Sequence, residues 1–480
     1  MKFPESKTKI VCTLGPASHS KKIIKELVLA GMNVARLNLA HDEVEYHRES
    51  LRYVREVEEE LGIVLPVMMD IPGPKIRIGK IKDGPILLKK GKTIRLTTEN
   101  IIGDESNIPV EYEGLIKSVK KGGLIYLYDG FIQLRVKEIM ENYVICQVLT
   151  GGKIDSHKGL NLPNTKIFLD AISDKDLELI SFGLDEGVNI FGISFVEKAE
   201  DIMKVKKFAR EKGKEIYTIA KIEREEAVSN IDEILKITDA IMVARGDLGV
   251  QVSIEDIPVI QKKLIAKANR MSKPVITATQ MLVSMTDHIR PTRSEVTDVA
   301  NAILDGTDAT MLSEETAIGQ YPVETVRMMT DIAISTEKEY RNFFQKSSLC
   351  DELRYSFQYE KPSVEDVISI HTMESSQIIR SKYILTPTES GNTARRISRF
   401  KPYCWILAFT TQESVARFLS LSYGVVSFKV DKEGNDWHKQ IMDILKEKKL
   451  AKKGEYLILT EGTIKMKTGG TDSMRIIPVD

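Results

Sequence analysis

The chain lacks several features that define large classes of protein. Its 480 residues contain no apolar run near the roughly 20 residues that a membrane helix needs, and no apolar secretion signal near the start. Its four cysteines form no CxxC pair, which indicates reduced thiols at Cys12, Cys146, Cys350 and Cys404. Its 69 basic and 69 acidic residues cancel, which argues against nucleic acid or a membrane surface as a partner. We therefore expect a cytoplasmic globular protein.

What the chain does contain is a regular alternation of strand-like apolar runs and helical patterns over its first 335 residues. Eight runs are typical of buried strands: 8–15, 33–39, 64–70, 189–195, 215–223, 240–247, 274–280 and 309–316. Eight strand–helix units predict a TIM (β/α)8 barrel, an α/β fold, and the chain length predicts further domains. The alternative is a large doubly wound sheet, which has the same alternation.

The alternation breaks after the third run and again near residue 340. Residues 75–158 alternate in period two with hairpin signals, which predicts an inserted antiparallel domain, a small β-barrel. It holds 15 Lys and Arg against 10 Asp and Glu, and a basic lid over the barrel would attract phosphates; an ordinary solvated surface is the alternative. Five later runs predict an open α/β domain. The predicted domains are the barrel (1–74 and 159–340), the lid (75–158) and a C-terminal regulatory or oligomerisation domain (341–480).

Polar residues gather at the carboxyl ends of the predicted strands, where a TIM barrel carries its active site. Glu223 and Asp247 end two successive strands and lie 24 residues apart, which is about one strand–helix–strand unit. They would therefore meet at neighbouring strand ends and share a divalent cation, with Lys221 beside them as a fixed positive charge. Such a clamp suits phosphoryl transfer. The alternative is that the carboxylates bind loop amides and that Lys221 forms a structural salt bridge with Glu223.

Eight segments in this order resemble the pyruvate kinase family: TKIVCTLGPAS (8–18), GMNVARLNLAH (31–41), DIPGPKIRIG (70–79), KGLNLP (158–163), AKIE (220–223), VARGDLGV (243–250), TATQML (277–282) and RPTRSEVTDVANAILDGTDATMLSEETAIGQYP (290–322). The resemblance is dense over residues 8–335 and looser in the C-terminal domain. It implies a glycolytic phosphotransferase that moves the phosphoryl group of phosphoenolpyruvate to ADP, giving ATP and pyruvate. It also implies a homotetramer that requires Mg²⁺ or Mn²⁺.

The resemblance assigns roles to the residues at matching positions. Glu223 and Asp247 match the Mg²⁺ ligands. Phosphoenolpyruvate would be bound by Arg36, Lys221, Gly246, Asp247 and Thr279. The catalytic set would be Lys221, Arg36, Thr279 and Ser313. Lys221 would face the transferring phosphoryl group and Thr279 would belong to the route that protonates the enolate, although a lone threonine is more often an ordinary buried residue.

The resemblance also places the nucleotide, ADP or ATP, against Asn38, His41, Arg77 and Lys158. Arg77 is the strongest member of this set. Asn38 and His41 are equally compatible with capping the loop that follows the second predicted strand.

The sequence departs from the family around its K⁺ site. Asn38 and Asp70 remain, but Ala40 and Ile71 replace the Ser and Thr oxygens, and Lys75 stands where K⁺-dependent relatives carry Glu. The loss of two of four oxygen ligands should cripple K⁺ binding. Because the lysine ammonium carries the same single charge, we predict that Lys75 substitutes for the cation and that K⁺ is not required. The alternative is that Lys75 is one more basic residue at the root of the lid.

Two departures concern regulation. Glu314 and Ile318 stand where the family commonly has Gly and Lys, and the sequence offers no physical account of Glu314. A loop in the C-terminal domain resembles one that binds an effector phosphate, through Thr388, Ser390, Gly391, Asn392 and Thr393. Glu389 in the same loop argues against fructose bisphosphate and leaves a monophosphate such as AMP, or no effector.

Two rival functions share parts of this pattern. The first is a Mg²⁺-dependent barrel lyase or aldolase that acts on a pyruvate enolate, and ADP dependence would distinguish it. The second is a non-catalytic metabolite sensor, which would be expected to have lost one or more of Arg36, Lys221, Glu223, Asp247 and Thr279.

Overall fold

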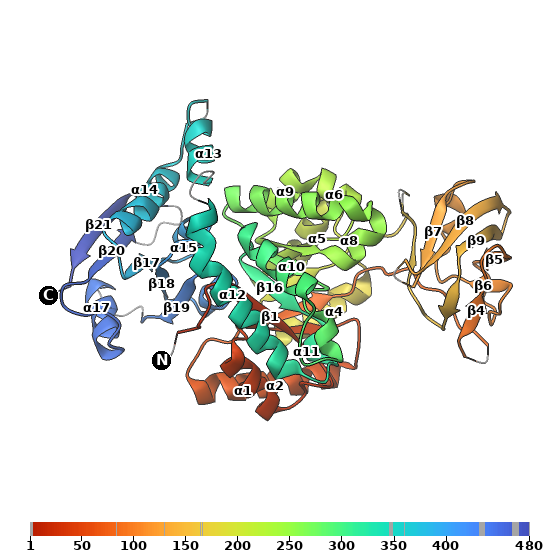
Figure 1. Cartoon of the computed structure of the whole chain (residues 1–480), viewed down its shortest axis with the longest axis horizontal. Coiled ribbons are helices and arrows are strands. Elements are labelled where there is room, and N and C mark those ends of the chain that lie inside the picture. The colour runs from red at the N-terminus through yellow and green to blue at the C-terminus, as the bar shows by residue number, and fades with distance from the viewer. Residues whose placement is uncertain are drawn as a thin grey trace.

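Three bodies lie in a row along the molecule (Figure 1): the C-terminal domain at one end, the barrel in the centre and the insert at the other end. The structure is a computed structural model and describes residues 3–82, 84–128, 130–163, 165, 167–344, 349–359, 361–431, 437–462 and 470–479. Among these residues, no helix combines the length and the apolar character that crossing a membrane requires.

Eight parallel strands close into a barrel in the order β1-β16-β15-β14-β13-β12-β3-β2. Their bounds are β1 Lys9–Leu14, β2 Val34–Asn38, β3 Val67–Ile71, β12 Ile190–Ile193, β13 Tyr217–Ile222, β14 Ala240–Ala244, β15 Val275–Ala278 and β16 Ala309–Leu312. Each predicted run contains one of these strands to within one residue. The barrel prediction is therefore confirmed, and the doubly wound alternative is wrong. Closure comes from β1 and β16, with Lys9 opposite Ala309.

Helices surround the barrel and bury one face against its strands (Figure 1). Their bounds are α1 Lys21–Ala30, α2 Val44–Leu61, α4 Asp174–Asp185, α5 Ala199–Glu211, α6 Glu225–Ser229, α7 Ile231–Ile237, α8 Arg245–Gln251, α9 Ile257–Arg270, α10 Arg293–Leu304, α11 Glu314–Ala317 and α12 Pro322–Phe344, with short 3₁₀ turns η1 Ile254–Asp256 and η2 Val283–Thr286. Helix α1 illustrates the rule: Ser20 caps its first turn, and Ile24, Leu27 and Ala30 form its buried face.

The insert consists of β4 Ile86–Leu88, β5 Thr93–Thr97, β6 Asn107–Pro109, α3 Leu115–Ser118, β7 Leu124–Leu127, β8 Ile132–Ile139, β9 Tyr143–Thr150, β10 Gly152–Ile154 and β11 Leu160–Asn161. Six of its strands form a sheet in the order β11-β7-β8-β9-β5-β6. Segment 76–79 closes this sheet into a small barrel, because Arg77 bridges to Gly159 on one side and Ile78 to Val110 on the other. The expected antiparallel arrangement is wrong for one pair: β5 and β6 run parallel. Period-two alternation reports which face is buried, not strand direction.

The C-terminal domain is a five-stranded open sheet in the order β19-β18-β17-β20-β21, as predicted. Its elements are α13 Leu349–Ser356, α14 Val364–Ile378, β17 Tyr383–Pro387, α15 Asn392–Ser398, β18 Trp405–Thr410, α16 Glu413–Leu419, β19 Val425–Lys429, α17 Trp437–Glu447, β20 Tyr456–Glu461 and β21 Ser473–Pro478. Phe418 of α16 and Leu421 join the apolar cluster inside the barrel. The Phe418 ring stacks on Tyr217 at the start of β13, with ring centres 4.1 Å apart. The C-terminal domain thus seals the amino-terminal end of the barrel.

Candidate active site

Four charged side chains form a buried cluster at the carboxyl ends of β2, β3 and β13. Arg36 donates from Nε and Nη2 to Oδ2 of Asp70, at 2.7 and 2.6 Å. The Nζ of Lys221 lies 3.1 Å from Oδ1 of Asp70 and 2.8 Å from Oε1 of Glu223. Asp70 and Glu223 are each only 1% exposed. Arginine and lysine thus present two fixed positive charges at the mouth of the barrel, held by two buried carboxylates.

Burial and charge act on these groups in opposite directions. Burial raises the pKa of the Asp70 carboxyl, but Lys221 and Arg36 outweigh burial and hold the pKa below its usual value. Burial lowers the pKa of the Lys221 ammonium, whereas Asp70 and Glu223 raise it above its ordinary value. The pKa of Glu223 is raised, first by burial and then by the negative charge of Asp247. Lys221 therefore stays charged, and a further cation beside Glu223 would be favourable.

Asp247 lies in the first turn of α8, one strand along from Glu223, because β13 and β14 are paired neighbours. Its carboxylate is 37% exposed and its Oδ1 lies 4.0 Å from the Nζ of Lys75. Glu223 is held differently, since its Oε2 accepts the Phe195 N–H at 2.8 Å. Within the described residues, no cluster of three or more His, Cys, Asp and Glu side chains is arranged as a metal site. The two carboxylates form a small, hard-oxygen donor pair with one buried and one accessible member.

Thr279 follows β15 with a backbone φ of +68°, a left-handed conformation that is costly for a β-branched residue. Its Oγ1 accepts the Gly246 N–H at 2.8 Å and donates to the Ala278 carbonyl at 2.6 Å. Arg245 holds the same turn, because its Nη2 donates to the Thr279 carbonyl at 2.8 Å and pairs with Asp298 at 2.7 Å. The strained turn is therefore tied to the start of α8, where Gly246 and Asp247 lie.

Arg77 and Lys158 lie side by side where the chain enters and leaves the insert. The Ile78 N–H donates to the Lys158 carbonyl at 2.9 Å, which pairs the two segments. Arg77 donates from Nη1 to the His157 carbonyl at 2.9 Å. The Nζ of Lys158 lies 4.6 Å from the centre of the Tyr128 ring. Both cations thus stand on the part of the insert nearest to the barrel.

Asn38 is the last residue of β2, and His41 lies in the loop that follows this strand. Asn38 caps this loop, because its Oδ1 accepts the Ala40 N–H and its carbonyl accepts the His41 N–H, both at 3.3 Å. The His41 carbonyl in turn lies 2.8 Å from Nε2 of His47. The capping interpretation therefore describes the Asn38 side chain, while His41 contributes backbone contacts.

Ser313 directly follows β16 and is linked to the segment after Thr279 through a buried carboxylate. Glu315 accepts the Ser313 N–H at 2.7 Å and the Leu282 N–H at 3.2 Å. Burial raises the pKa of this carboxyl. Two unusual residues flank it: Glu314 is exposed and Ile318 is 58% exposed. Nothing in the structure explains the choice of Glu314.

The predicted effector loop lies between β17 and α15 in the C-terminal domain. Thr388 accepts the Gly391 N–H at 2.9 Å, and Thr393 Oγ1 lies 2.5 Å from Oγ1 of Thr471. Glu389 accepts hydrogen bonds from Thr411 and Gln412 at 3.3 and 3.4 Å, and the loop also holds Ser390 and Asn392. The loop is thus hydrogen-bonded to neighbouring segments, and it carries the acidic side chain of Glu389.

Two residues in contact with the cluster had no role assigned to them in the predicted site. Thr13, near the end of β1, accepts from Nη1 of Arg36 at 2.8 Å. Ser194, just after β12, accepts from Lys221 at 2.7 Å and donates to Asp70 at 3.4 Å. Both are polar residues near strand ends, the same pattern that indicated the active-site face from the sequence.

The same residues lie in segments that match known proteins. The family model described as "Pyruvate kinase, barrel domain" matches residues 5–326, and "Pyruvate kinase, alpha/beta domain" matches residues 366–477. The chain belongs to the pyruvate kinase family. A pyruvate kinase from Thermococcus litoralis is 49% identical over 482 residues, covering 100% of both chains.

More distant members of the pyruvate kinase family align nearly as completely. A pyruvate kinase from Staphylococcus saprophyticus is 40% identical, over 98% of this chain and 80% of its own length. "Pyruvate kinase 2" from Synechocystis is 39% identical, over 98% of this chain and 79% of its own length. Membership of the pyruvate kinase family makes the chain a phosphotransferase, and it confirms the resemblance drawn from the strand-end motifs.

Proposed function

We propose that this chain transfers the phosphoryl group of phosphoenolpyruvate to ADP, giving ATP and pyruvate. The observation that carries this proposal is the buried cluster of Arg36, Asp70, Lys221 and Glu223 at the mouth of the barrel. Phosphoryl transfer needs positioned positive charge around the oxygens of the transferring group, and it needs little covalent chemistry from the protein. Two cations fixed by buried carboxylates meet this need without reorganising during the reaction.

The donor pair of Glu223 and Asp247 fits Mg²⁺ or Mn²⁺. Hard cations of this kind take carboxylate oxygens and commonly use only one or two of them, which leaves positions for substrate and water. The raised pKa of Glu223, caused by burial and by Asp247, supports this fit because a cation would relieve both effects. When bound, the ion would neutralise phosphate charge and orient the transferring group.

The residues around the donor pair would bind the substrate, stabilise its charge and deliver a proton. Arg36 would grip phosphate oxygens through its planar guanidinium, and Lys221 would stabilise charge on the transferring group and the developing enolate. Gly246 and Asp247, at the start of α8, would receive the carboxylate end of phosphoenolpyruvate. Thr279 would belong to the route that delivers a proton to the enolate carbon. Ser313 would belong to the same group of residues as Thr279, because Glu315 binds the backbone of Ser313 and of the segment after Thr279.

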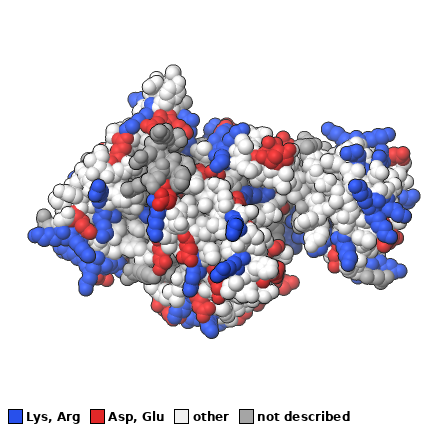
Figure 2. All heavy atoms as spheres, in the orientation of Figure 1, with Lys and Arg blue, Asp and Glu red and all other residues white. Residues whose placement is uncertain are grey.

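The nucleotide would bind between the loop after β2 and the root of the insert. Arg77 and Lys158 would contact ADP or ATP phosphates from the insert side, and Asn38 and His41 from the barrel side. Figure 2 shows basic side chains spread over the visible surface of the insert, which supports attraction of an anionic nucleotide.

Lys75 is proposed to replace the monovalent cation of K⁺-dependent relatives. It carries one positive charge close to the Asp247 carboxylate, 4.0 Å away, at the root of the insert. Ala40 and Ile71 remove two oxygens that would otherwise hold K⁺ beside Asn38 and Asp70. Activity should therefore require Mg²⁺ but not K⁺.

Assembly, location and regulation follow the family. We propose a homotetramer that works in the cytoplasm. Glu389 opposes a highly charged effector, so the loop of Thr388, Ser390, Gly391, Asn392 and Thr393 would accept a monophosphate such as AMP or no effector at all.

The deciding experiment measures pyruvate formation from phosphoenolpyruvate, ADP and Mg²⁺, with K⁺ present or with K⁺, Na⁺ and NH₄⁺ excluded. Equal activity in both is the expected result. Activity only with K⁺ would contradict the role of Lys75 and keep the reaction. A folded protein without activity in either would favour the lyase or the sensor, and pyruvate release without ADP would favour the lyase.

A further inference from the structure

The insert is joined to the barrel by two connections, one outgoing and one returning (Figure 1). The outgoing connection is Pro72-Gly73-Pro74-Lys75, which follows β3 directly. The returning connection runs from β11 to Ser173, the residue that caps α4. Any movement of the insert relative to the barrel must pass through these two connections.

A single buried carboxylate binds the barrel end of both connections. Asp176 accepts the Gly73 N–H of the outgoing connection on Oδ1, at 3.1 Å. Its Oδ2 accepts the Ser173 N–H at 2.8 Å and the Ser173 hydroxyl at 2.6 Å. Asp176 is only 2% exposed. One side chain thus joins residues that lie about 100 positions apart in sequence, and it uses a different oxygen for each.

The backbone of the outgoing connection changes direction at Gly73. Gly73 has a φ of +65°, which a glycine adopts freely, and it lies between two prolines whose φ is fixed. A Cβ at Gly73 would lie 3.1 Å from the Phe195 ring and 3.3 Å from Ser194, so the backbone rests against the end of β12. Ser194 in turn touches Lys221. The turning point of the insert is therefore packed directly on the charged cluster.

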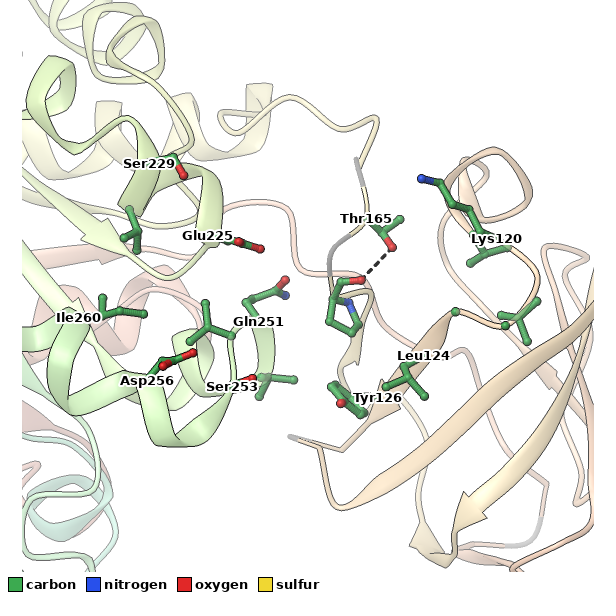
Figure 3. Close-up of a pocket in the computed structure, with 18 of the residues that line it drawn as sticks. Lys120, Leu124, Tyr126, Thr165, Glu225, Ser229, Gln251, Ser253, Asp256 and Ile260 are labelled. Carbon is green, nitrogen blue, oxygen red and sulfur yellow. Dashed lines mark hydrogen bonds between the residues drawn. The ribbon is translucent and has the colours of Figure 1, made fainter.

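An open cleft of about 720 Å³ lies beside the returning connection, between the insert and helices α6, α8 and α9. Figure 3 shows Lys120, Leu124 and Tyr126 on the insert side and Gln251 and Asp256 on the barrel side, facing each other across the space. Thr165 on the returning connection bonds only locally among the residues drawn, to the Pro163 carbonyl at 2.9 Å. The insert thus has room to rotate about its connections.

We propose that Asp176 is a positioning residue that pins both connections and so sets the angle of the insert over the barrel. This inference rests on the proposed function and deepens it, because Arg77 and Lys158 reach the nucleotide only at the correct angle. Capping α4 alone would need the Ser173 contacts and not the contact with Gly73. The experiment must therefore separate the contact of Oδ1 with Gly73 from the contacts of Oδ2 with Ser173.

The test compares Asp176→Asn with Ser173→Ala. An amide has one accepting oxygen and cannot serve both connections, whereas Ser173→Ala weakens the cap and leaves the Oδ1 contact with Gly73 intact. Spin labels at Lys120→Cys and Lys263→Cys, two exposed positions on opposite sides of the cleft, report the interdomain distance. The half-buried Cys350 is replaced by Ser in every protein so that labelling is specific.

We expect Asp176→Asn to broaden the distance distribution and to raise the KM for ADP roughly three- to tenfold, the effect of about one lost hydrogen bond, with a smaller change in kcat. Ser173→Ala should keep the wild-type distribution even where it lowers the melting temperature as much. An unchanged distribution in Asp176→Asn, or equal broadening in both variants, would overturn the proposal.

A second measurement needs no variant. Gly73 carries the only amide hydrogen in Pro72-Gly73-Pro74, so hydrogen exchange of this segment reports one hydrogen bond. Slow exchange in the wild-type chain is expected, and exchange as fast as in an unfolded peptide would overturn the proposal. Distance and exchange are read without turnover. An inactive wild-type chain would therefore contradict the proposed reaction and leave this inference to be judged separately.

Discussion

The Nζ of Lys221, near the end of β13, lies 2.8 Å from Oε1 of Glu223, the residue that directly follows this strand. Alternate residues of a strand point to the same side, which is why the strand end brings them together. The structural salt bridge and the proposed catalytic arrangement are therefore the same contact in this structure. Its removal should affect both activity and stability.

Replacing Lys221 with Met should lower kcat about a thousandfold. A unit charge about 4 Å from the transferring group is worth roughly 4 kcal/mol at an effective dielectric near 20. The change also leaves Asp70 and Glu223 with one cation fewer, so the melting temperature should fall. Steady-state kinetics and thermal unfolding measure the two effects.

Lys206→Met is the matched control, because Lys206 is paired with Asp239 at 2.7 Å, away from the mouth of the barrel. It should lose stability and keep its turnover. Turnover of Lys221→Met above a tenth of the wild-type rate would contradict the assigned role.

Replacing Thr279 with Val should lower activity at least tenfold, whereas Thr279→Ser should keep most of it. Valine has nearly the same shape but cannot accept the Gly246 N–H, which is accepted at 2.8 Å by the Thr279 hydroxyl. Serine keeps the hydroxyl and lowers the cost of the left-handed backbone. Equal activity of the two variants would show that the hydroxyl has no function, and solvent isotope exchange into pyruvate would test the proton route directly.

Reversing the charge of Lys75 should abolish most activity at any K⁺ concentration. Lys75→Glu places a carboxylate beside Asp247, and Ala40 and Ile71 still supply no side-chain oxygen for K⁺. Lys80→Glu makes the same charge change in the same segment, on an exposed side chain, and should be nearly neutral. Full activity of Lys75→Glu, or equal losses in both variants, would refute the role of Lys75.

Lys9 should make stability depend on pH in an alkaline window. Burial lowers its pKa to about 7, although Glu337 and Asp308 raise it and Lys7 lowers it further. The folded state therefore holds fewer protons than the unfolded state between pH 7 and the ordinary lysine pKa of 10.5. Stability should rise with pH across this window, by up to about 1.4 kcal/mol per pH unit from this group.

Lys9→Met cannot bind the proton and tests this directly. The difference between the unfolding free energies of the wild type and the variant should grow in favour of the wild type as pH rises. Loss of the hydrogen bond from Lys9 to the Val425 carbonyl, at 2.8 Å, adds a constant that does not depend on pH. Denaturant unfolding at pH 7.5, 8.5 and 9.5 measures the slope, and parallel curves would contradict the prediction.

The sequence predicted the parts of the fold that leave a local pattern. Most barrel strands are apolar runs that stop at a polar residue, as β13 does at Glu223, so the strands and their ends were both readable. Contacts between distant segments left no such pattern. The bridges of Arg77 and Ile78, and the entry of Phe418 into the barrel, depend on register and packing that only the folded chain determines.

The candidate site could likewise be predicted where the signal is local, and not where it depends on contacts between distant segments. Residues at strand ends, such as Arg36 and Glu223, could be named because their chemistry is distinctive. Thr13 was not named, and Ser194 was given no role, because a hydroxyl near a strand end usually only bonds its neighbours. Asp176 was missed because its position in a helix-capping sequence gives a sufficient local explanation, and its bond to Gly73 is visible only in three dimensions.

The pairing of Lys9 with Ala309 sets the order in which the parts of this protein can be completed during synthesis. The first barrel strand leaves the ribosome long before its final partner has been made. The core of the insert, which runs from Ile76 to Leu162, is complete far earlier. We therefore expect the insert to fold first, attached to an unfinished sheet of three strands, because domains generally fold as units as they emerge. Phe418 is synthesised later still. The amino-terminal end of the barrel is therefore covered only after the eight strands can have closed.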